Sequence, residues 1–162
     1  MTGSPYNLDE IRFELDPFVR LHSPLLQSGL AIWHGLAGGR AMPARRDLDP
    51  TMLPPCLLPH VLLIDVEYQP CPRFRWRLIG THITNTIGRD STGRYWDELY
   101  DQATRQSLST GPLWVLKHRR PVRTLGKAPV TGRSHLRSEN IDLPLSSNGR
   151  DIDMLLVFSS YD

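Results

Sequence analysis

The sequence predicts an α+β domain in which helices pack on an antiparallel sheet. Three observations support this prediction: apolar residues at helical spacing follow Ser23, a strand–turn–strand pattern spans residues 60–80, and two strand-like runs flank Asn148–Gly149. A run of helical patterns separates the first strands from the last ones. This order is typical of an α+β fold with the helices gathered on one face of the sheet.

Length and composition fit one globular domain. The chain has 162 residues, of which 40% are hydrophobic and 22% charged, and this is enough to form a core. No apolar run approaches the roughly 20 residues that span a bilayer, and the first residues lack a basic-then-apolar signal pattern. We therefore expect a cytoplasmic protein without a membrane partner. The net charge of +2 gives no reason to expect nucleic acid.

The chain divides into three expected parts. Residues 1–22 mix acidic and apolar side chains around a proline, and we expect an irregular N-terminal arm. Residues 23–39 form an N-terminal helix, and residues 40–162 form the main domain.

Capping residues set the bounds of the N-terminal helix. Ser23 is suited to the N-cap, Pro24 to the first turn, and Gly38 to the end of the helix. The apolar stripe of this helix must be covered by the sheet, by a second copy of the chain, or by both.

Two strands follow, over residues 60–67 and 73–80, joined by a proline-containing turn. The second strand alternates arginines with apolar residues, which places Phe74, Trp76 and Leu78 on one face. Such a strand belongs to an antiparallel sheet with one face on a core and the other in water.

Helical patterns cover residues 81–88 and 95–118, and Gly111–Pro112 must kink or split the second of them. Strands are expected at residues 121–130, 133–145 and 151–158, the last two joined by an Asn–Gly turn. In the last strand one face carries four apolar residues: Ile152, Met154, Leu156 and Phe158.

A basic cluster lies at the end of the second helical pattern, with Arg123 close by: Lys117, His118, Arg119 and Arg120. Basic side chains are favoured at a helix C-terminus, so a solvated helix end explains the cluster. Contact with nucleic acid is the alternative.

Motifs for metal binding and catalysis are absent from the sequence. Cys56 and Cys71 lack the paired spacing of zinc ligands, and we expect buried or half-buried thiols. No G-x-S-x-G, H-E-x-x-H or phosphate-binding G-x-x-x-x-G-K-[ST] pattern occurs. We therefore expect no enzymatic activity, no catalytic residues and no metal site.

Five sequence blocks follow Trp33: GGRAMPARRDLDP at 38–50, LPHVLLIDV at 58–66, RFRWRLIGT at 73–81, GRDSTGR at 88–94 and LPLSSNGRDIDMLL at 143–156. In this order they resemble a bacterial PAS-like domain family, the stand-alone PAS-type proteins common in alphaproteobacteria. The resemblance covers nearly the whole chain.

This resemblance implies a five-stranded antiparallel sheet in the order 2-1-5-4-3, with helices over one face, in addition to the N-terminal helix. It also implies a sensory or signalling role, because PAS domains hold small ligands between sheet and helices or pair with other domains. It does not fix a cofactor: no set of haem, flavin or chromophore ligands maps onto this chain, and the cofactor stays unknown. Pro112 departs from the family pattern, since it interrupts the helix that covers the pocket.

The candidate pocket combines apolar strand positions with aromatic helix positions and a few polar groups. Its expected residues are Phe74, Trp76, Leu78, Met154 and Leu156 on the strands, Trp96, Leu99 and Trp114 on the helices, and His82, Asn85, Thr86 and Arg94 as polar groups. For each aromatic residue the alternative is a packed core position. For His82 a haem ligand and a hydrogen-bonded structural histidine are the two interpretations.

We thus expect a non-catalytic sensory module that binds a small ligand or a signalling-protein partner and acts by association. A homodimer would form through residues 23–38 and the neighbouring sheet. A nucleic-acid-associated regulator that uses the arginines around Arg119 is the alternative, followed by a small enzyme of unrecognised type.

Overall fold

The computed structural model describes residues 12–68, 71–87, 90–129 and 135–161. It contains a six-stranded, fully antiparallel sheet in the order β1-β4-β5-β6-β2-β3. The strands are β1 (Arg12–Asp16), β2 (Val61–Glu67), β3 (Arg73–Ile79), β4 (Val122–Pro129), β5 (His135–Leu145) and β6 (Met154–Tyr161). Without β1 the order is that of the expected five-stranded sheet, so the strand count was wrong by one.

The additional strand β1 lies within the arm that we expected to be irregular. Arg12–Asp16 pairs with β4 and supplies hydrogen-bonding partners to what would otherwise be a free sheet edge. The expectation of an irregular arm is therefore wrong for these five residues. The alternation of Phe13 and Leu15 with polar residues was a strand signal in the sequence, but five residues give a weak one.

The helices are α1 (Pro24–Ala37), α2 (Thr81–Ile87), α3 (Trp96–Leu99), α4 (Gln102–Leu108) and α5 (Thr110–His118), with short 3-10 turns η2 (Arg45–Asp47), η3 (Pro50–Met52) and η4 (Leu58–His60). The Ser23 hydroxyl accepts a hydrogen bond from the Leu26 amide, and Gly38 ends α1 in the left-handed conformation, as the sequence predicted. The long helical pattern is split into three helices, and Pro112 lies in the first turn of α5.

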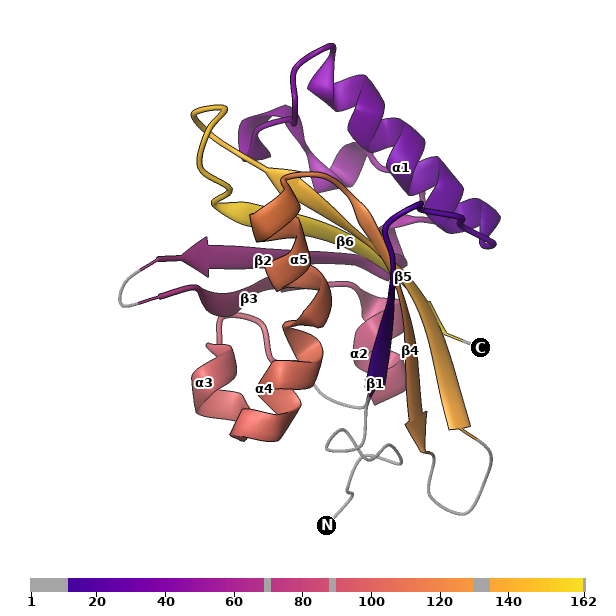
Figure 1. Cartoon of the computed structure of the whole chain (residues 1–162). Helices are drawn as coiled ribbons and strands as arrows, with labels where there is room; N and C mark the ends of the chain where they lie inside the picture. Colours follow the sequence, from indigo (N-terminus) through magenta and orange to yellow (C-terminus); the bar gives the residue numbers. More distant parts are fainter. Residues whose placement is uncertain (1–11, 69–70, 88–89, 130–134, 162) are drawn as a thin grey trace.

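Helices cover both faces of the sheet: those after β3 gather on one face, as expected, and the N-terminal helix lies on the other (Figure 1). The central strands are buried at consecutive positions, as in the run Val61–Ile64 of β2 and Met154–Phe158 of β6. Consecutive side chains of a strand point to opposite faces, so both faces of these strands need a cover. α1 covers one face, and α3, α4 and α5 cover the other.

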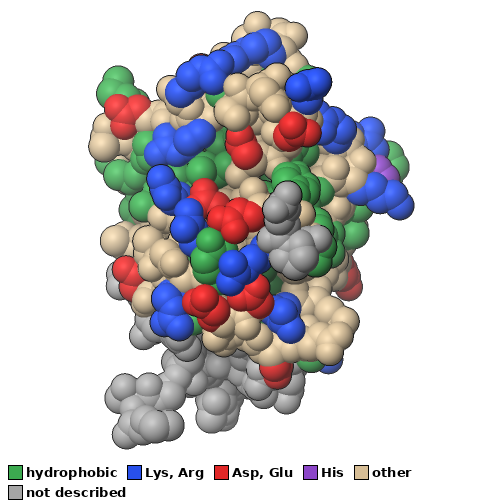
Figure 2. Space-filling view, turned by 90° about the vertical axis from the view of Figure 1, so that its left-hand side faces the viewer, with side chains coloured by type: hydrophobic (Ala, Val, Ile, Leu, Met, Phe, Trp, Pro, Cys, Tyr) green, Lys and Arg blue, Asp and Glu red, His purple; other side chains and the backbone are tan. Residues whose placement is uncertain are grey.

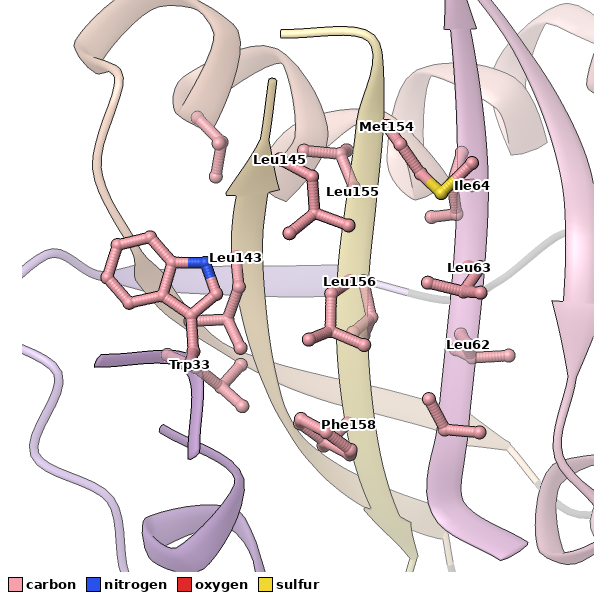
Figure 3. Close-up of a cluster of buried hydrophobic side chains, with 14 of the residues drawn as sticks. Trp33, Leu62, Leu63, Ile64, Leu143, Leu145, Met154, Leu155, Leu156 and Phe158 are labelled. Carbon is pink, nitrogen blue, oxygen red and sulfur yellow. The ribbon is translucent and has the colours of Figure 1, made fainter. Parts of the chain in front are cut away.

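The α1 face is closely packed. Trp33 is 3% exposed and donates a hydrogen bond from Nε1 to the Pro144 carbonyl at 2.9 Å. Gly29 lies against the ring of Phe158, close enough that a Cβ at this position would overlap the ring. Figure 3 shows Trp33 beside Leu143, with Leu156 and Phe158 on the neighbouring strand. The apolar stripe of α1 is therefore covered by the sheet.

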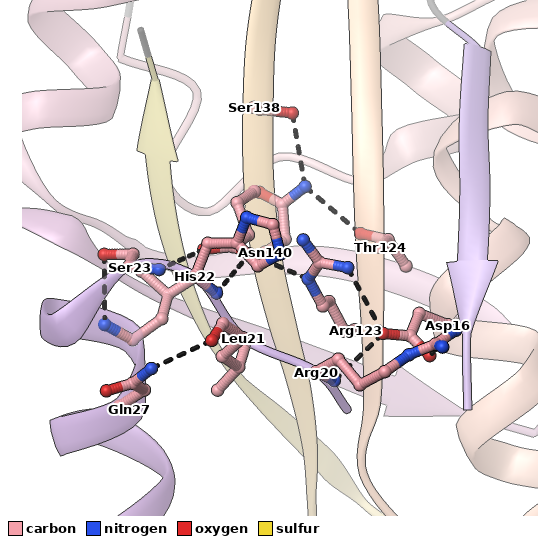
Figure 4. A network of polar contacts seen from close by, with 12 residues as sticks. Asp16, Arg20, Leu21, His22, Ser23, Gln27, Arg123, Thr124, Ser138 and Asn140 are labelled. Carbon is pink, nitrogen blue, oxygen red and sulfur yellow. Dashed lines mark hydrogen bonds and ion pairs between the residues drawn. The ribbon is translucent and has the colours of Figure 1, made fainter. Parts of the chain in front are cut away.

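An ion-pair network joins the N-terminal segment to the sheet (Figure 4). Arg123 of β4 contacts Asp16 of β1 at 3.2 Å and Glu139 of β5 at 2.7 Å, and all three side chains are at least 88% buried. Glu139 also accepts from the backbone amides of His22 and Ser23 at the start of α1. The backbone amide of Arg20 is the largest of several donors that lower the pKa of Asp16 to about 2.

No helix in the described part of the chain is long and apolar enough to cross a membrane. Cys56 and Cys71 are both exposed free thiols, so the expectation that they are buried or half-buried is wrong. Both lie in loops next to prolines, which explains why neither enters the core.

Candidate functional site

A cavity of about 120 Å³ lies between the sheet and the helices α2 to α5. Its sheet wall is formed by side chains that share one face of the strands, since Leu62, Ile64 and Val157 occupy neighbouring paired positions. Its opposite wall comes from the helices and the segments between them. The residues that line it are Phe13, Leu62, Ile64, Trp76, Ile79, Ile83, Ser91, Trp96, Tyr100, Leu108, Gly111, Pro112, Thr124, Asn140, Asp142, Val157, Ser159 and Tyr161.

Aromatic side chains form one end of the cavity. Trp96 of α3 packs against Trp76 of β3 and against Phe74, with both pairs of ring centroids 4.9 Å apart. Trp76 Nε1 donates to the Tyr100 hydroxyl at 3.1 Å. Trp96 Nε1 is buried and has no hydrogen-bond partner among the described residues. Trp76 and Trp96 thus line the cavity, while Phe74 supports Trp96 from the side.

Polar side chains of β4, β5 and β6 form a satisfied network on the sheet wall. Asn140 Nδ2 donates to Thr124 Oγ1 at 3.1 Å and to Ser138 Oγ at 3.2 Å, and these three residues are visible in Figure 4. The Ser159 hydroxyl donates to Asn140 Oδ1. Both amide hydrogens and the amide oxygen of Asn140 are therefore engaged within the protein.

Asp142 is the exception in this polar wall. Its side chain is 4% exposed and lines the cavity, yet no described residue donates a hydrogen bond to its carboxyl or forms an ion pair with it. Burial raises the pKa of Asp142 to about 7. The carboxyl lies against Gly111 in the first turn of α5, where a Cβ would collide with Oδ2. Glycine at this position lets α5 approach the carboxyl.

Two influences act in opposite directions on the Asp142 carboxyl. The N-terminus of α5 favours a negative charge by about 0.3–1 kcal/mol. Burial without a partner disfavours the charge more strongly. It raises the pKa of the carboxyl by about three units, which corresponds to roughly 4 kcal/mol. Burial therefore dominates, and the pKa of the Asp142 carboxyl lies well above its usual range.

The other predicted site residues do not all meet at this cavity. Leu78 lies on the opposite sheet face, because the pairing of β3 with β2 skips Arg77: Leu63 pairs with Leu78, and Ile64 pairs with Trp76. This β-bulge reverses the alternation, and Ile79 lines the cavity in place of Leu78. The assignment of Leu78 to the face of Trp76 is therefore wrong.

Met154 and Leu156 also lie on the α1 face, since Asp65 and Leu63 are their partners on β2. Their expected place opposite Trp96 is wrong. Residues 154–159 of β6 are buried on both faces of the sheet, and only one of these faces borders the cavity. Val157, Ser159 and Tyr161 are the β6 residues that reach the cavity.

The remaining candidates lie around the cavity or outside it. His82 stacks on His60 with ring centroids 4.0 Å apart and lies 5.9 Å from the Tyr161 ring, and burial together with the His60 charge lowers its pKa. Trp114 faces His118, 4.2 Å away, and does not line the cavity. Leu99 and Arg94 are not part of the cavity wall. The side chains of Asn85 and Thr86 lie outside the described residues.

The sequence contained a signal for the missed polar residues. Ser138, Asn140 and Asp142 alternate with apolar residues in a predicted strand, and such polar positions normally face water. Here they are buried, and α5 lies against this strand at Asp142. Periodicity showed that they share a face, but not that this face is the floor of a cavity.

A comparison with known families agrees with this geometry. A family model described as PAS domain matches residues 21–157. The chain belongs to the PAS domain family. The match spans all strands of the sheet except β1 and the end of β6. No curated protein matches this PAS domain, so relatives add nothing on its ligand or partner.

Family membership makes the chain a sensory or signalling module in general terms, and PAS domains are as a rule not catalytic. Figure 2 shows Lys and Arg interspersed with Asp and Glu on the face it presents, without segregation into one basic patch. Arg123 of the predicted basic cluster is buried in the ion-pair network, which leaves Lys117, His118, Arg119 and Arg120 exposed.

Proposed function

We propose that this PAS domain is a sensory module that holds a small ligand in the cavity beneath α5 and passes the bound state on by association with a partner. The observation that carries this proposal is the buried Asp142 carboxyl, which faces the cavity without a partner among the described residues. A buried polar group without a partner costs stability, and a ligand that satisfies it restores that loss.

The size of the cavity favours a compact ligand. About 120 Å³ is close to the roughly 150 Å³ of an engineered apolar cavity that accepts benzene, and it is well below the 300–1,000 Å³ of common cofactor pockets. A flavin or a haem would need a large rearrangement of the helices. We therefore propose a small molecule and no large cofactor.

The polar groups of the cavity do not form a catalytic unit. Ser159 donates its hydroxyl hydrogen to the amide oxygen of Asn140, which is not a base, and Asp142 is not hydrogen-bonded to a nucleophile among the described residues. This arrangement supports recognition and not covalent chemistry, and the proposed module has no catalytic activity of its own.

Association with a second copy is the proposed route of output, with the exposed side of α1 as the contact. The buried side of α1 packs on the sheet and Trp33 belongs to the core, so a dimer must use residues such as half-buried Leu30 and exposed Ala31. Light scattering at increasing concentration tests this part of the proposal. A monomer at all concentrations would contradict it, and a signalling-protein partner would then be the remaining route.

Native mass spectrometry of freshly purified protein, combined with uptake of small probes, tests the ligand proposal. We expect a bound small molecule, or binding of neutral probes of about five non-hydrogen atoms such as isobutanol. Val157→Phe should abolish this binding while circular dichroism stays unchanged, since the larger side chain fills the cavity. A wild-type protein that takes up no small molecule at all would overturn the proposal.

A further inference from the structure

Two residues that line the cavity carry polar groups without a described partner, the Trp96 indole N–H and the Asp142 carboxyl, and only the carboxyl can carry a charge. The neighbouring polar groups Asn140, Thr124 and Ser159 are already bonded to one another or to Ser138. Asp142 accepts no hydrogen bond from any described residue, although only 4% of its surface is exposed. The polar group of a ligand therefore finds its strongest interaction at this carboxyl.

The charge of the cavity wall selects among ligands. The titratable side chains that line the cavity besides Asp142 are the phenols of Tyr100 and Tyr161, and none of its described lining residues is Lys, Arg, His or Glu. The basic residues of β4, Arg123 and Lys127, lie on the opposite face of the sheet, and Lys117 and His118 lie at the far end of α5. An anionic ligand would meet a like charge on the ionised carboxylate, and only the N-terminus of α5 would offset it weakly, so an anion is disfavoured.

A cationic ligand fits the same wall in three ways. Its positive charge pairs with the ionised carboxylate, which is buried and therefore poorly hydrated. Its additional N–H donors find acceptors in the second lone pairs of the Thr124 and Ser159 hydroxyls, which line the cavity. The indole rings of Trp76 and Trp96 at the other end offer apolar surface and electron-rich faces.

We propose that the ligand of this cavity is a small protonated amine with a compact apolar body, whose ammonium group pairs with the Asp142 carboxylate. This inference rests on the proposed function and specifies its ligand class. The cavity volume limits the ligand to about five or six non-hydrogen atoms, by comparison with the benzene-sized cavity of roughly 150 Å³.

The proposal predicts a definite pH dependence. The amine binds the ionised form of Asp142, and burial raises the pKa of this carboxyl to about 7 in the empty cavity. Affinity for the amine should therefore rise about tenfold per pH unit below pH 7 and level off above it. A ligand that accepts a hydrogen bond from the protonated carboxyl would show the opposite trend.

Calorimetric titration with three probes that share a branched four-carbon skeleton tests the proposal: isobutylamine, isobutanol and isobutyrate, each between pH 5 and pH 8.5. We expect isobutylamine to bind at least tenfold more tightly than isobutanol at pH 8, and isobutyrate not to bind. Asp142→Asn should lose at least tenfold in amine affinity and keep its affinity for isobutanol. Glu14→Gln, which removes an exposed carboxylate on β1, controls for net charge and should bind as the wild type does.

The outcomes separate the two proposals. Binding of isobutanol without preference for the amine, or amine affinity that is flat or falls between pH 5 and pH 8, overturns the amine assignment and leaves the ligand cavity in place. Failure of all three probes to bind overturns the ligand cavity and the amine assignment together. The pH profile is measured on the wild-type protein, so the test stands even if Asp142→Asn does not fold.

Discussion

At the scale of single residues, this PAS domain is distinguished by two buried acidic groups with opposite environments. Asp16 is surrounded by donors, among which the Arg20 amide has the largest effect, and its pKa falls to about 2. Asp142 is equally buried but has no described donor, and its pKa rises to about 7. Burial alone does not decide the protonation of a carboxyl; the donors around it do.

Asp142 makes the protein less stable as the pH rises. Its pKa in the folded state lies above the usual 3.8, so the native state binds the proton more tightly than the unfolded state between about pH 4 and pH 7. The contribution of Asp142 to stability is therefore lost across this window, by roughly 4 kcal/mol at most. We expect Asp142→Asn to be more stable than the wild type at pH 8, with a difference that shrinks towards pH 4.

Urea denaturation of both proteins at several pH values measures this difference. Other carboxyl groups titrate in both proteins and cancel in the comparison. A constant difference between pH 4 and pH 8 would show that Asp142 has an ordinary pKa, and a donor would then have to lie near its carboxyl.

At the scale of elements, the packing of α1 on the sheet depends on one small residue, Gly29. Gly29 faces the Phe158 ring so closely that a methyl group would overlap it, whereas nothing lies within 4 Å of a methyl group at Gly35 in the same helix. Both positions are helix interior, so glycine costs about 1 kcal/mol relative to alanine at each of them. Only at Gly29 does close packing explain its presence.

Gly29→Ala and Gly35→Ala form a matched pair of variants. We expect Gly35→Ala to raise the free energy of unfolding by about 0.5–1 kcal/mol, through helix propensity alone. Gly29→Ala should lower it by about 1–3 kcal/mol, because α1 must move away from β6. Thermal and urea denaturation measure both changes, and equal stabilisation by the two substitutions would show that α1 does not pack on Phe158 as described.

At the scale of the whole molecule, the ion-pair network joins the segment from Asp16 to Ser23 to the sheet. Arg123 connects β1 to β5, and Glu139 holds the backbone at the entry to α1. The described part of the arm, the helix and the sheet are therefore in direct contact. The division of the chain at residues 22 and 39 stays a prediction.

Arg123→Met should destabilise the protein by about 3–5 kcal/mol, because it leaves two buried carboxylates without their partner. Lys127→Met changes an exposed residue on the same face of the same strand and should alter stability by less than about 0.5 kcal/mol. Urea denaturation compares the two variants, and hydrogen exchange of the β1 amides should accelerate only in Arg123→Met. Equal effects of both substitutions would contradict the role of Arg123.

Local signals in the sequence determined most elements of this protein. Ser23 and Gly38 mark the ends of α1. The strand at residues 60–67 follows from a β-branched and leucine-rich run, and the strand at residues 73–80 from period-two alternation. These features depend on neighbours within a few residues, so a single sequence carries them. The sheet order, in contrast, came from the resemblance to PAS domains and not from the pattern of residues.

Only the tertiary structure decided which residues meet in the cavity. A single bulge at Arg77 moved Leu78 to the α1 face, and the burial of both faces of β6 separated Met154 from Trp76. The polar alternation that ends in Asp142 is visible in the sequence, but its burial depends on α5 and on the glycine that lets this helix approach. Alternation along a strand is local, whereas register and cover are set by contacts between distant segments.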